Sequence, residues 1–359
     1  MDAFGKIGFN SSECGIITDV LMLSDIYGIE SHGMQRLVRY HKGIEKGLIK
    51  IGAEPEIVFE TPVTAVIDAH SGMGQLVGHK AMEMAIEKAS QSGMAIVSVR
   101  NSNHYGIAGY YAKLACDKGL MGFSCTNSEA IMVPTNGRLA MIGSNPIAIA
   151  MPADPYPFIY DASTTVVTRG KLETYNKKGI PLPEGWALDK DGHQTTDAPD
   201  VLKNIVQKNG GGIMPLGGME ELTGSHKGYG FGMICEIFSS ILSLGMTSNY
   251  AMQGNFSGIC HGFAAINPSF FGDAAEIRKH LSKFLEELRK SPKAEGKERI
   301  YTHGEKEVEA AEDRLKNGIP VNVNTLVEMV DFANFVGLDP KEYFGDFDAE
   351  KTRMFSDNY

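Results

Sequence analysis

The sequence predicts a mixed α/β protein in which both ends of the chain are helical and the middle combines strands with helices. Apolar residues in 11–48 and in 273–335 recur at the spacing of amphipathic helices. Short apolar runs bounded by turn residues lie between these two segments. Hydrophobic residues make up 43% and charged residues 22% of the chain, which is an ordinary globular balance. We therefore expect a discontinuous helical domain from residues 1–60 and 273–359 that flanks a central α/β domain from residues 61–272.

The N-terminal segment predicts two helices. Ser11 and Ser12 are suitable caps for the first, because a hydroxyl can accept a hydrogen bond from a free backbone N–H group. The second helix is expected from Ser31 through Gly43.

The central segment predicts strands that alternate with helices. A strand at Ala65–Asp68, a helix at His79–Ser90 and a strand at Met94–Val99 form a β-α-β unit. A helix and two strands follow, at 109–118, 121–126 and 147–151. The stretch Tyr175–Asp200 is rich in proline and glycine, so we expect a surface excursion that closes on the Gly210–Gly212 turn.

Helices dominate the last third of the chain. Lys227–Leu244 is an apolar run typical of a long helix. Beyond Asp273 the composition becomes charged, and helices are expected over 277–288, 307–316 and 323–335.

The charge balance excludes several classes of protein. Lys and Arg number 34 against 44 Asp and Glu, and the resulting net charge of −10 disfavours binding to nucleic acids or anionic membranes. An anionic small molecule must therefore be met by cations placed locally. No apolar run approaches the roughly 20 residues of a membrane helix, and the N-terminus lacks the pattern of a signal peptide.

The cysteines predict neither a disulfide framework nor a metal site. They are five in number, widely spaced and without a C-x-x-C pair, so buried thiols are expected. No pair of histidines stands at ligand spacing beside a carboxylate on a predicted helix, so no metal is expected. The lack of a membrane-length apolar run and of a signal-peptide pattern predicts a cytoplasmic protein.

The first candidate site lies within the second predicted helix. His32, Arg36 and Tyr40 recur there at i, i+4 and i+8, so on a helix they would project from one face. A guanidinium can hold a carboxylate through two parallel hydrogen bonds, a phenol adds a third donor, and an imidazole can move a proton near neutral pH. The alternative is a solvated helix face with an incidental histidine.

The second candidate site is the loop Asn101–Gly106, which directly follows a predicted strand. Loops in this position commonly carry functional residues in α/β proteins. His104 is its titratable residue, and the neighbouring Asn and Ser side chains can fix the tautomer of the ring. The alternative is a turn whose residues suit the backbone geometry and leave His104 exposed.

Three further segments could contact a nucleotide. Gly72-Met73-Gly74 with Gly78 is similar to a Rossmann turn, but the spacing is G-x-G-x-x-x-G and the next strand does not end in an acidic residue. Lys227 lies at a helix start, where free N–H groups and the helix dipole attract phosphate, although a solvated lysine is the alternative. Asp161–Thr165 carries a hydroxyl cluster that is more often a helix cap than a ligand site.

Taken together, these segments resemble the malate/L-lactate dehydrogenase family. This family is distinct from the Rossmann-fold malate and lactate dehydrogenases and includes ureidoglycolate, sulfolactate and diketogulonate-type enzymes. The resemblance covers nearly the whole chain and rests on six ordered motifs: SHGMQRLVRY (31–40), NSNHYGIAGYYA (101–112), VPTNGRLAMIGSNPIAIAMP (133–152), DASTTVVTRGKL (161–172), GSHKGYGFGMICEI (224–237) and GEKEVEAAEDRLKNGIPV (304–321).

The resemblance implies a non-Rossmann NAD(P)-binding fold with a largely antiparallel sheet. It also implies a homodimer whose active sites lie between domains and near the subunit interface. By motif position, His104 and His32 handle the proton. The substrate contacts implied are Ser31, Arg36, Tyr40 and Ser128, with Arg36 and Tyr40 holding the carboxylate. The cofactor contacts implied are Asp161, Ala162, Ser163, Thr164, His226, Lys227, Gly228, His303, Gly304 and Glu305.

The expected function is hydride transfer between NAD(P) and a small 2-hydroxy acid. Malate and oxaloacetate are the first expected pair, lactate and pyruvate or sulfolactate come next, and NAD is slightly favoured over NADP. His104 is the expected proton donor, and His32 polarises or orients the substrate. The alternatives are a ureidoglycolate dehydrogenase, a cyclic imino acid reductase, or a catalytically silent nucleotide-binding protein.

Overall fold

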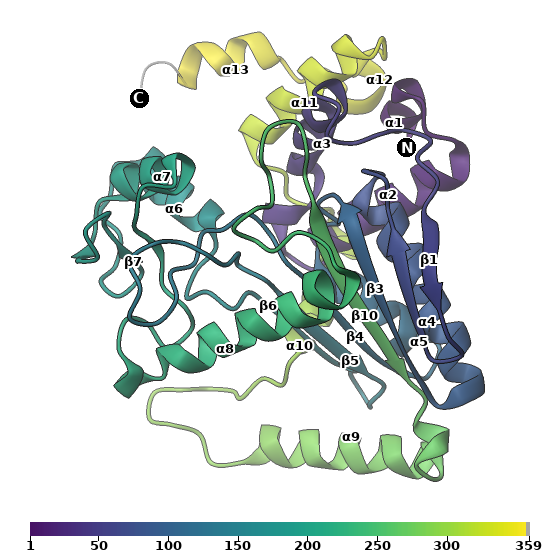
Figure 1. The fold of residues 1–359 in the computed structure, drawn as a ribbon. Coiled ribbons are helices and arrows are strands. Elements are labelled where there is room, and N and C mark those ends of the chain that lie inside the picture. Colours follow the sequence, from purple (N-terminus) through teal and green to yellow (C-terminus); the bar gives the residue numbers. More distant parts are fainter. Residues whose placement is uncertain (357–359) are drawn as a thin grey trace.

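A computed structural model describes residues 1–356, apart from the side chains of residue 177 and of residues 353–356. Its centre is a seven-stranded sheet with the strand order β1-β2-β3-β10-β4-β5-β6 (Figure 1). The strands are β1 (Glu56–Glu60), β2 (Thr64–Asp68), β3 (Met94–Ser102), β10 (Ile259–Ile266), β4 (Met121–Thr126), β5 (Ile147–Met151) and β6 (Phe158–Ala162). Within this sheet β2 and β3 pair in parallel, and the other pairings are antiparallel. The expected, largely antiparallel sheet is therefore confirmed.

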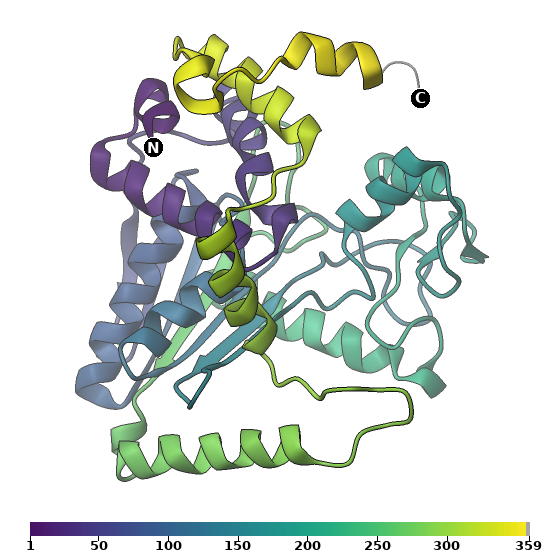
Figure 2. The ribbon, with the colours of Figure 1, turned by 180° about the vertical axis from the view of Figure 1, so that it is seen from behind.

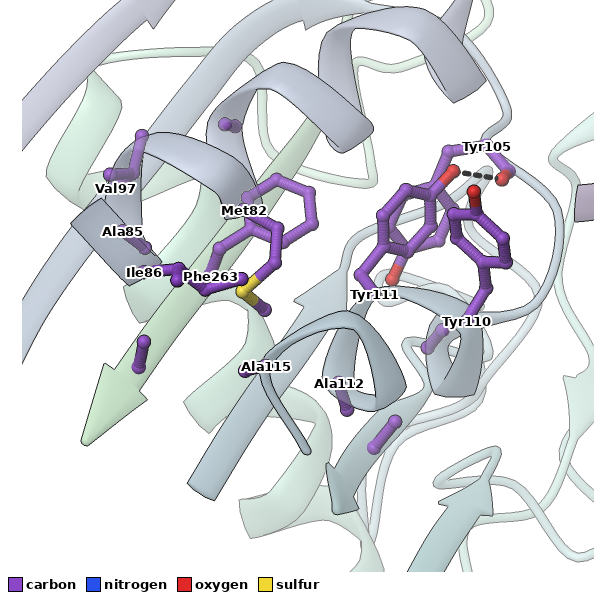
Figure 3. Packing of buried hydrophobic residues seen from close by; sticks show 14 of the residues in the cluster. Met82, Ala85, Ile86, Val97, Tyr105, Tyr110, Tyr111, Ala112, Ala115 and Phe263 are labelled. Atoms are coloured by element: carbon purple, nitrogen blue, oxygen red, sulfur yellow. Dashed lines mark hydrogen bonds between the residues drawn. The ribbon is translucent and has the colours of Figure 1, made fainter. Parts of the chain in front are cut away.

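Helices cover both faces of this sheet. α4 (Gly74–Ser92) and α5 (Ala108–Asp117) pack on one face, and α8 (Ser225–Glu236) with the π-helical turn Ile237–Ile241 lies on the other (Figures 1 and 2). α4 joins β2 to β3, which confirms the predicted β-α-β unit. The main core lies between α4, α5 and the strands, as Figure 3 shows for Met82, Ile86, Val97, Tyr111 and Phe263.

An aromatic stack supports the loop that follows β3. The ring centroids of Tyr105 and Tyr111 lie 4.5 Å apart, and Tyr105 also stacks on His261 at 4.3 Å. The Tyr111 hydroxyl donates to the carbonyl oxygen of Tyr105 at 2.5 Å (Figure 3). Both ring nitrogens of His261 are hydrogen-bonded, to Thr126 at 2.8 Å and to Ser102 at 3.0 Å. Since every ring here is buried and partnered, the loop has a rigid base.

The two ends of the chain meet at one end of the sheet (Figures 1 and 2). The helices there are α1 (Asp2–Ile7), α2 (Ser11–Ile26), α3 (Leu37–Glu45), α11 (Val323–Phe335), α12 (Pro340–Phe344) and α13 (Ala349–Ser356). α10 (Glu305–Asn317) leads up to them from the middle of the sheet (Figure 2). Arg314 on α10 donates to the carbonyl oxygen of Asp25 at 2.5 Å and to Glu30 at 2.9 Å. These contacts attach the C-terminal helices to the N-terminal ones.

Two elements depart from the domain bounds expected from the sequence. β1 lies within residues 1–60 but pairs with β2, so a boundary after residue 60 divides a hairpin of the sheet. α9 (Ala274–Lys290) lies at the opposite end of the sheet from the other C-terminal helices (Figure 1). Its apolar stripe includes Phe284, which is 54% exposed.

The segment expected to be a surface excursion has its own core. It contains α6 (Arg169–Lys178), α7 (Ala198–Gln207) and a small sheet with the order β8 (Gln194–Thr195), β7 (Ala187–Leu188), β9 (Gly212–Ile213). Leu172, Val201, Ile205 and Ile213 are buried there. The sequence analysis expected a surface excursion here and did not predict its core, because the proline and glycine residues hid the helical spacing of the apolar residues in α7. The described residues hold four short 3-10 turns elsewhere, which span Glu30–His32, Met34–Arg36, Glu221–Thr223 and Pro268–Phe270.

The structure also bears on the expected buried thiols and on the search for membrane-spanning helices. All five cysteines are buried and free, as predicted. Among the helices of residues 1–356, none has the length and the apolar character needed to cross a bilayer.

Candidate active site

A cavity of about 550 Å³ brings many of the predicted residues together. Its volume lies within the usual range of small-molecule sites, roughly 300–1,000 Å³. The predicted residues that line it are Ser31, His32, Arg36, His104, Ser128, Asp161, Ala162 and Ser163. They come from the N-terminal helices, the loop after β3, the loop after β4 and the end of β6. The structure therefore joins the two candidate sites that the sequence presented separately.

Hydrogen bonds from the Asn103 side chain hold the backbone of the His104 loop in place. The buried Asn103 side chain donates to three carbonyl oxygens, those of Leu48, Ser71 and Gly72, at 2.9, 3.0 and 3.0 Å. The expectation that neighbouring Asn and Ser side chains fix the His104 tautomer was wrong, because these side chains bond elsewhere. They fix the backbone instead.

Tyr40 and a backbone amide determine the protonation of the His104 ring. Nδ1 lies 2.7 Å from the Tyr40 hydroxyl and accepts from the Gly106 N–H group at 3.3 Å. Because an amide can only donate, the neutral ring carries its proton on Nε2, which has no partner among the described residues. Burial raises the pKa of Tyr40 to about 12, so this phenol stays protonated. It can turn from donor to acceptor when the ring takes up a second proton.

Tyr40 itself does not line the cavity. It is 1% exposed and lies behind His104, with ring centroids 5.8 Å apart. The family resemblance implied that the Tyr40 hydroxyl holds the substrate carboxylate. In the structure this hydroxyl is hydrogen-bonded to His104 instead.

His32 forms a second imidazole beside the first. The two rings stack with centroids 5.5 Å apart, and Nδ1 of His32 lies 2.8 Å from the Ser31 hydroxyl. Burial, then the Arg36 and Arg39 cations, lower the pKa of His32 to about 3. Burial, then the Arg39 cation, the neighbouring His32 ring and the Arg36 cation, hold the pKa of His104 well below its usual value. The site is thus electropositive and favours an anionic ligand, and its two rings do not both carry a charge.

The helix expected from Ser31 to Gly43 is interrupted. Two 3-10 turns, Glu30–His32 and Met34–Arg36, precede α3, which starts at Leu37. A methyl group at Gly33 would lie 1.8 Å from Asp25 Oδ1, and Asp25 Oδ2 accepts from the Met34 N–H group at 2.8 Å. The carboxylate thus occupies the space of a side chain at residue 33 and breaks the helix. His32 and Arg36 still reach one cavity, but not as neighbours on a helix face.

Arg36 is anchored so that its terminal nitrogens stay available. Its Nε donates to the Ser31 carbonyl oxygen at 2.5 Å. Neither Nη atom has a hydrogen-bond partner among the described residues. Two parallel donors on a fixed guanidinium suit a carboxylate.

Asp161 and its neighbours form another wall. Asp161 Oδ2 accepts from the Gly109 N–H group at 2.6 Å at the start of α5, so it caps that helix. Burial raises the pKa of Asp161 to about 6. Ala162 and Ser163 line the cavity, whereas the Thr164 hydroxyl donates to the Ser144 carbonyl oxygen at 3.1 Å and is 2% exposed.

Glu236 is a buried carboxylate that the sequence analysis missed. It is 2% exposed and accepts from Asn145 Nδ2 at 3.0 Å and from Ser240 Oγ at 2.7 Å. Asn145 in turn accepts from the Ser128 N–H group at 3.0 Å. Glu236, the last residue of α8, therefore holds Asn145, and Asn145 in turn positions Ser128 at the cavity wall. Its signal in the sequence is a single acid within an apolar helix.

Arg169 is a second residue that the sequence analysis missed. It lines the cavity at the start of α6 and donates to Glu129 at 3.0 Å and to Glu173 at 3.1 Å. It lies within the family motif at 161–172, of which the sequence analysis considered only Asp161–Thr165.

Two predicted groups of cofactor residues lie outside this cavity. His226 and Lys227 are exposed at the start of α8, and Gly228 packs against the backbone of Leu216. Glu305 accepts from the Thr302 N–H group at 2.9 Å at the start of α10. His303 and Gly304 lie beside β6: the His303 carbonyl oxygen accepts from the Ile159 N–H group at 3.1 Å, and Gly304 packs against Ile159 and Pro157. In the single chain, these two groups of residues lie at the N-termini of α8 and α10.

The Gly72–Gly74 turn does not bind a nucleotide in the Rossmann manner. A methyl group at Gly74 would lie 2.3 Å from the Asn103 carbonyl oxygen and 2.4 Å from that of His104. This glycine lets α4 begin directly against the His104 loop.

Comparison with known proteins identifies the class of molecule. A family model described as malate/L-lactate dehydrogenase matches residues 1–330. The chain belongs to this family, and it is therefore an enzyme, a dehydrogenase. The resemblance inferred from the six motifs is confirmed, and the alternative of a catalytically silent nucleotide-binding protein is excluded.

Individual relatives are similar over almost their full length. A malate dehydrogenase of Pyrococcus abyssi is 44% identical over 335 residues, which are 93% of this chain and 91% of that protein. An L-sulfolactate dehydrogenase of Methanocaldococcus jannaschii is 37% identical and covers 96% of each chain. The crystal structure of malate dehydrogenase from Entamoeba histolytica superposes with a TM-score of 0.90 at 36% identity, covering 94% of each chain.

Gly74→Ala tests the contact beneath His104. The added methyl group meets backbone oxygen atoms that cannot rotate away, so we expect the free energy of unfolding to fall by about 1–3 kcal/mol. We also expect a lower kcat, since His104 must move. Chemical denaturation and steady-state kinetics on one preparation measure both. Gly15→Ala in α2 is the control, because a methyl group there has nothing within 4 Å; unchanged stability and kcat in Gly74→Ala would contradict the tight contact.

Proposed function

We propose that this chain is an NAD-dependent malate dehydrogenase that interconverts malate and oxaloacetate. The observation that carries the proposal is one cavity in which a carboxylate clamp, Arg36, and a proton-handling imidazole, His104, lie with the loop Asp161–Ser163. The names of the relatives support malate as the first substrate and sulfolactate as the next. Lactate and pyruvate share the same 2-hydroxy and 2-keto carboxylate unit.

Each residue of the site has a chemical role in this reaction. A bound nicotinamide supplies or accepts the hydride at the substrate C2. The Nη groups of Arg36 hold the C1 carboxylate, and His104 Nε2 gives a proton to the carbonyl oxygen as negative charge develops there. His32, kept neutral by burial, donates a hydrogen bond that orients the same oxygen. Tyr40 accepts or donates at His104 Nδ1 and so stabilises both protonation states of the ring.

The cavity favours NAD over NADP. Glu129, Glu173 and Glu307 line it along with Arg169, whose guanidinium is paired with two of these carboxylates. A ribose 2′-hydroxyl can donate to a carboxylate, whereas a 2′-phosphate is repelled by it. We propose that the cofactor lies along Asp161–Ser163 and Ser128 and that its phosphates reach Lys227.

A homodimer is the proposed assembly. α8 and the segment after it expose a run of large apolar side chains, and such a patch on a monomer is typical of a protein interface. The exposed residues are Phe231, Met233, Ile234, Ile237, Ile241, Leu242, Leu244, Met246 and Tyr250. Sedimentation equilibrium measures the mass in solution. The five free thiols also fit a reducing compartment, so we propose the cytoplasm.

Lys227→Ala tests the proposed phosphate contact. Loss of a charge-assisted hydrogen bond of about 1.5–3 kcal/mol should raise the cofactor KM and leave the fold intact, since the side chain is exposed. Titration of NADH fluorescence measures the dissociation constant directly. Lys208→Ala, at another exposed lysine, is the control. Identical NADH binding in wild type and Lys227→Ala would mean that Lys227 is merely solvated.

The proposed function is tested by a panel of 2-keto acids assayed with NADH and with NADPH through the loss of absorbance. We expect the highest kcat/KM for oxaloacetate with NADH. Reduction of none of the 2-keto acids with either cofactor would refute the proposal.

A further inference from the structure

Gln75 is a buried amide whose polar atoms lack partners. The residue is 0% exposed, and neither Oε1 nor Nε2 makes a hydrogen bond of normal geometry with a described residue. A buried polar group that is left unpaired destabilises a fold, so nearly all such groups in proteins are hydrogen-bonded. An apolar side chain of similar length, such as methionine, would avoid this cost. Stability alone therefore does not account for glutamine at this position.

The fold places Gln75 beside the pair Tyr40–His104. Gln75 belongs to the first turn of α4 and directly follows Gly74. At Gly74 the helix packs so closely on the His104 loop that a methyl group would lie 2.4 Å from the His104 carbonyl oxygen. The Gln75 amide lies beside the Tyr40 hydroxyl: burial raises the pKa of Tyr40 to about 12, and this amide opposes the rise because it favours the phenolate.

The Tyr40 hydroxyl has to serve two states of the His104 ring. Beside the neutral ring, which carries its proton on Nε2, the phenol donates to Nδ1 at 2.7 Å, and its oxygen can accept a further hydrogen bond. Beside the protonated ring, Nδ1–H donates to the phenol oxygen, and the phenolic O–H must turn to another acceptor. Tyr40 is 1% exposed, so that acceptor has to come from the protein interior.

An amide suits both states, because it carries a donor and an acceptor on one group. Gln75 Nε2 can donate to the phenol oxygen in the first state, and Oε1 can accept from the phenolic O–H in the second. From this geometry we infer that Gln75 is a positioning residue, which acts through Tyr40 and stabilises the protonated His104 ring. The inference rests on the proposed function, in which His104 gives its Nε2 proton to the substrate. Gln75 is not among the described residues that line the substrate cavity, so it acts without touching the substrate.

The other groups around the ring all oppose its protonation. Burial is the largest of these influences, and Arg39, His32, Arg36 and His261 follow; each lowers the pKa of His104. The protonated ring is therefore favoured only by the bound anionic substrate and by the hydrogen bond at Nδ1. A group that strengthens this hydrogen bond should be visible in the pH dependence of the reaction.

Gln75→Met removes the amide and keeps the approximate length of the side chain. The protonated ring loses the support of one neutral hydrogen bond, so kcat for oxaloacetate reduction at pH values above the His104 pKa should fall by roughly 3- to 10-fold. Because activity falls as pH rises through this pKa, the fall of kcat should move to lower pH by roughly 0.5–1 unit. Toward lower pH the two enzymes should converge, and KM should change little. Steady-state kinetics over a pH series measure all three.

A double-mutant cycle tests whether Gln75 acts through Tyr40. Tyr40→Phe should shift the pH profile of kcat by itself, and adding Gln75→Met to it should cause no further shift. Thr18→Val is the matched control, because Thr18 Oγ1 is also a buried atom without a partner among the described residues and lies outside the substrate cavity. Its profile should match that of the wild type. A wild-type profile in Gln75→Met, an equal loss of kcat at every pH, or additive shifts in the double variant overturns the inference and leaves the dehydrogenase function standing.

Nuclear magnetic resonance of the His104 ring separates this inference from the proposed function. The ring nitrogen signals, assigned by their loss in His104→Asn, follow protonation in the complex with NADH and malonate and need no turnover. Gln75→Met should lower the pH of this titration by the same interval as in the kinetics. An enzyme that reduces no 2-keto acid but shows this shift refutes the proposed function and retains the role of Gln75 at the ring. Gln75→Leu, which also lacks the amide, gives the same readout if Gln75→Met does not fold.

Discussion

Replacing His104 with asparagine is expected to lower kcat for oxaloacetate reduction by about 10²- to 10⁴-fold, the usual contribution of a positioned general acid. Asparagine keeps much of the size and polarity of the side chain but has no transferable proton. NADH binding should persist, because the Asn103 bonds and the aromatic stack hold the loop independently of the imidazole. Stopped-flow or steady-state absorbance measurements give kcat, and fluorescence titration gives the cofactor affinity.

The pH dependence gives a second readout of the same variant. In the free enzyme, burial, then the Arg39 cation, the neighbouring His32 ring and the Arg36 cation, lower the pKa of His104. An anionic substrate offsets those cations and raises this pKa in the complex. Since reduction requires the protonated ring, activity falls as pH rises through each pKa, so kcat/KM should fall at lower pH than kcat. The fall of kcat/KM and the fall of kcat with rising pH should both disappear in His104→Asn.

The control for His104→Asn is His70→Asn. His70 is about half exposed and pairs with Glu56 outside the cavity, so its replacement should leave kcat and the pH profile unchanged. His32→Asn should raise KM more than it lowers kcat. If instead His32→Asn abolishes turnover and the pH-dependent limb while His104→Asn keeps both, the two histidines have the opposite roles.

Local sequence patterns predicted the sheet and its helices well. The strands at 121–126 and 147–151 agree with β4 and β5 at both ends. Apolar runs bounded by turn residues carry this information within a few positions of the chain. The antiparallel pairing came from the family motifs instead, because no local pattern encodes which distant strand becomes the neighbour of β3.

The interrupted helix at Gly33 shows what local patterns cannot carry. The helical spacing of His32 and Arg36 is real in the sequence, but Asp25 fills the space beside Gly33 and accepts from the Met34 N–H group. That contact joins residues nine positions apart and overrides the local preference. The same limit applies to the Tyr40–His104 hydrogen bond, which joins two motifs 64 positions apart.

Glu236 and Arg169 were missed for a related reason. Each is a single charged residue inside a segment whose other residues suggested something else, and its role depends on distant partners. Glu236 supports Ser128 through Asn145, and Arg169 meets Glu129 across 40 positions. A buried charge in an apolar helix is costly unless it is hydrogen-bonded, so the isolated acid of α8 was the usable signal.

Replacing Arg36 with lysine is expected to lower kcat/KM for oxaloacetate by roughly 10- to 100-fold, which corresponds to one lost charge-assisted hydrogen bond. The Arg36 guanidinium is anchored through Nε on the Ser31 carbonyl oxygen, at 2.5 Å, and this leaves both Nη groups for a carboxylate. An ammonium group cannot make the anchoring bond and the paired contact at once. The substrate then sits less precisely against His104, so kcat should fall together with kcat/KM.

The same variant separates binding from folding. Arg36 lies at a cavity wall and its guanidinium makes one hydrogen bond to the other described residues, so the melting temperature of Arg36→Lys should stay close to that of the wild type. Differential scanning calorimetry measures this. Arg278→Lys is the control for an arginine on the surface, where the side chain is half exposed and pairs with Asp154. Because oxaloacetate and pyruvate share the C1 carboxylate, both should lose kcat/KM by similar factors in Arg36→Lys. Wild-type efficiency with either substrate would place the carboxylate clamp elsewhere in the cavity.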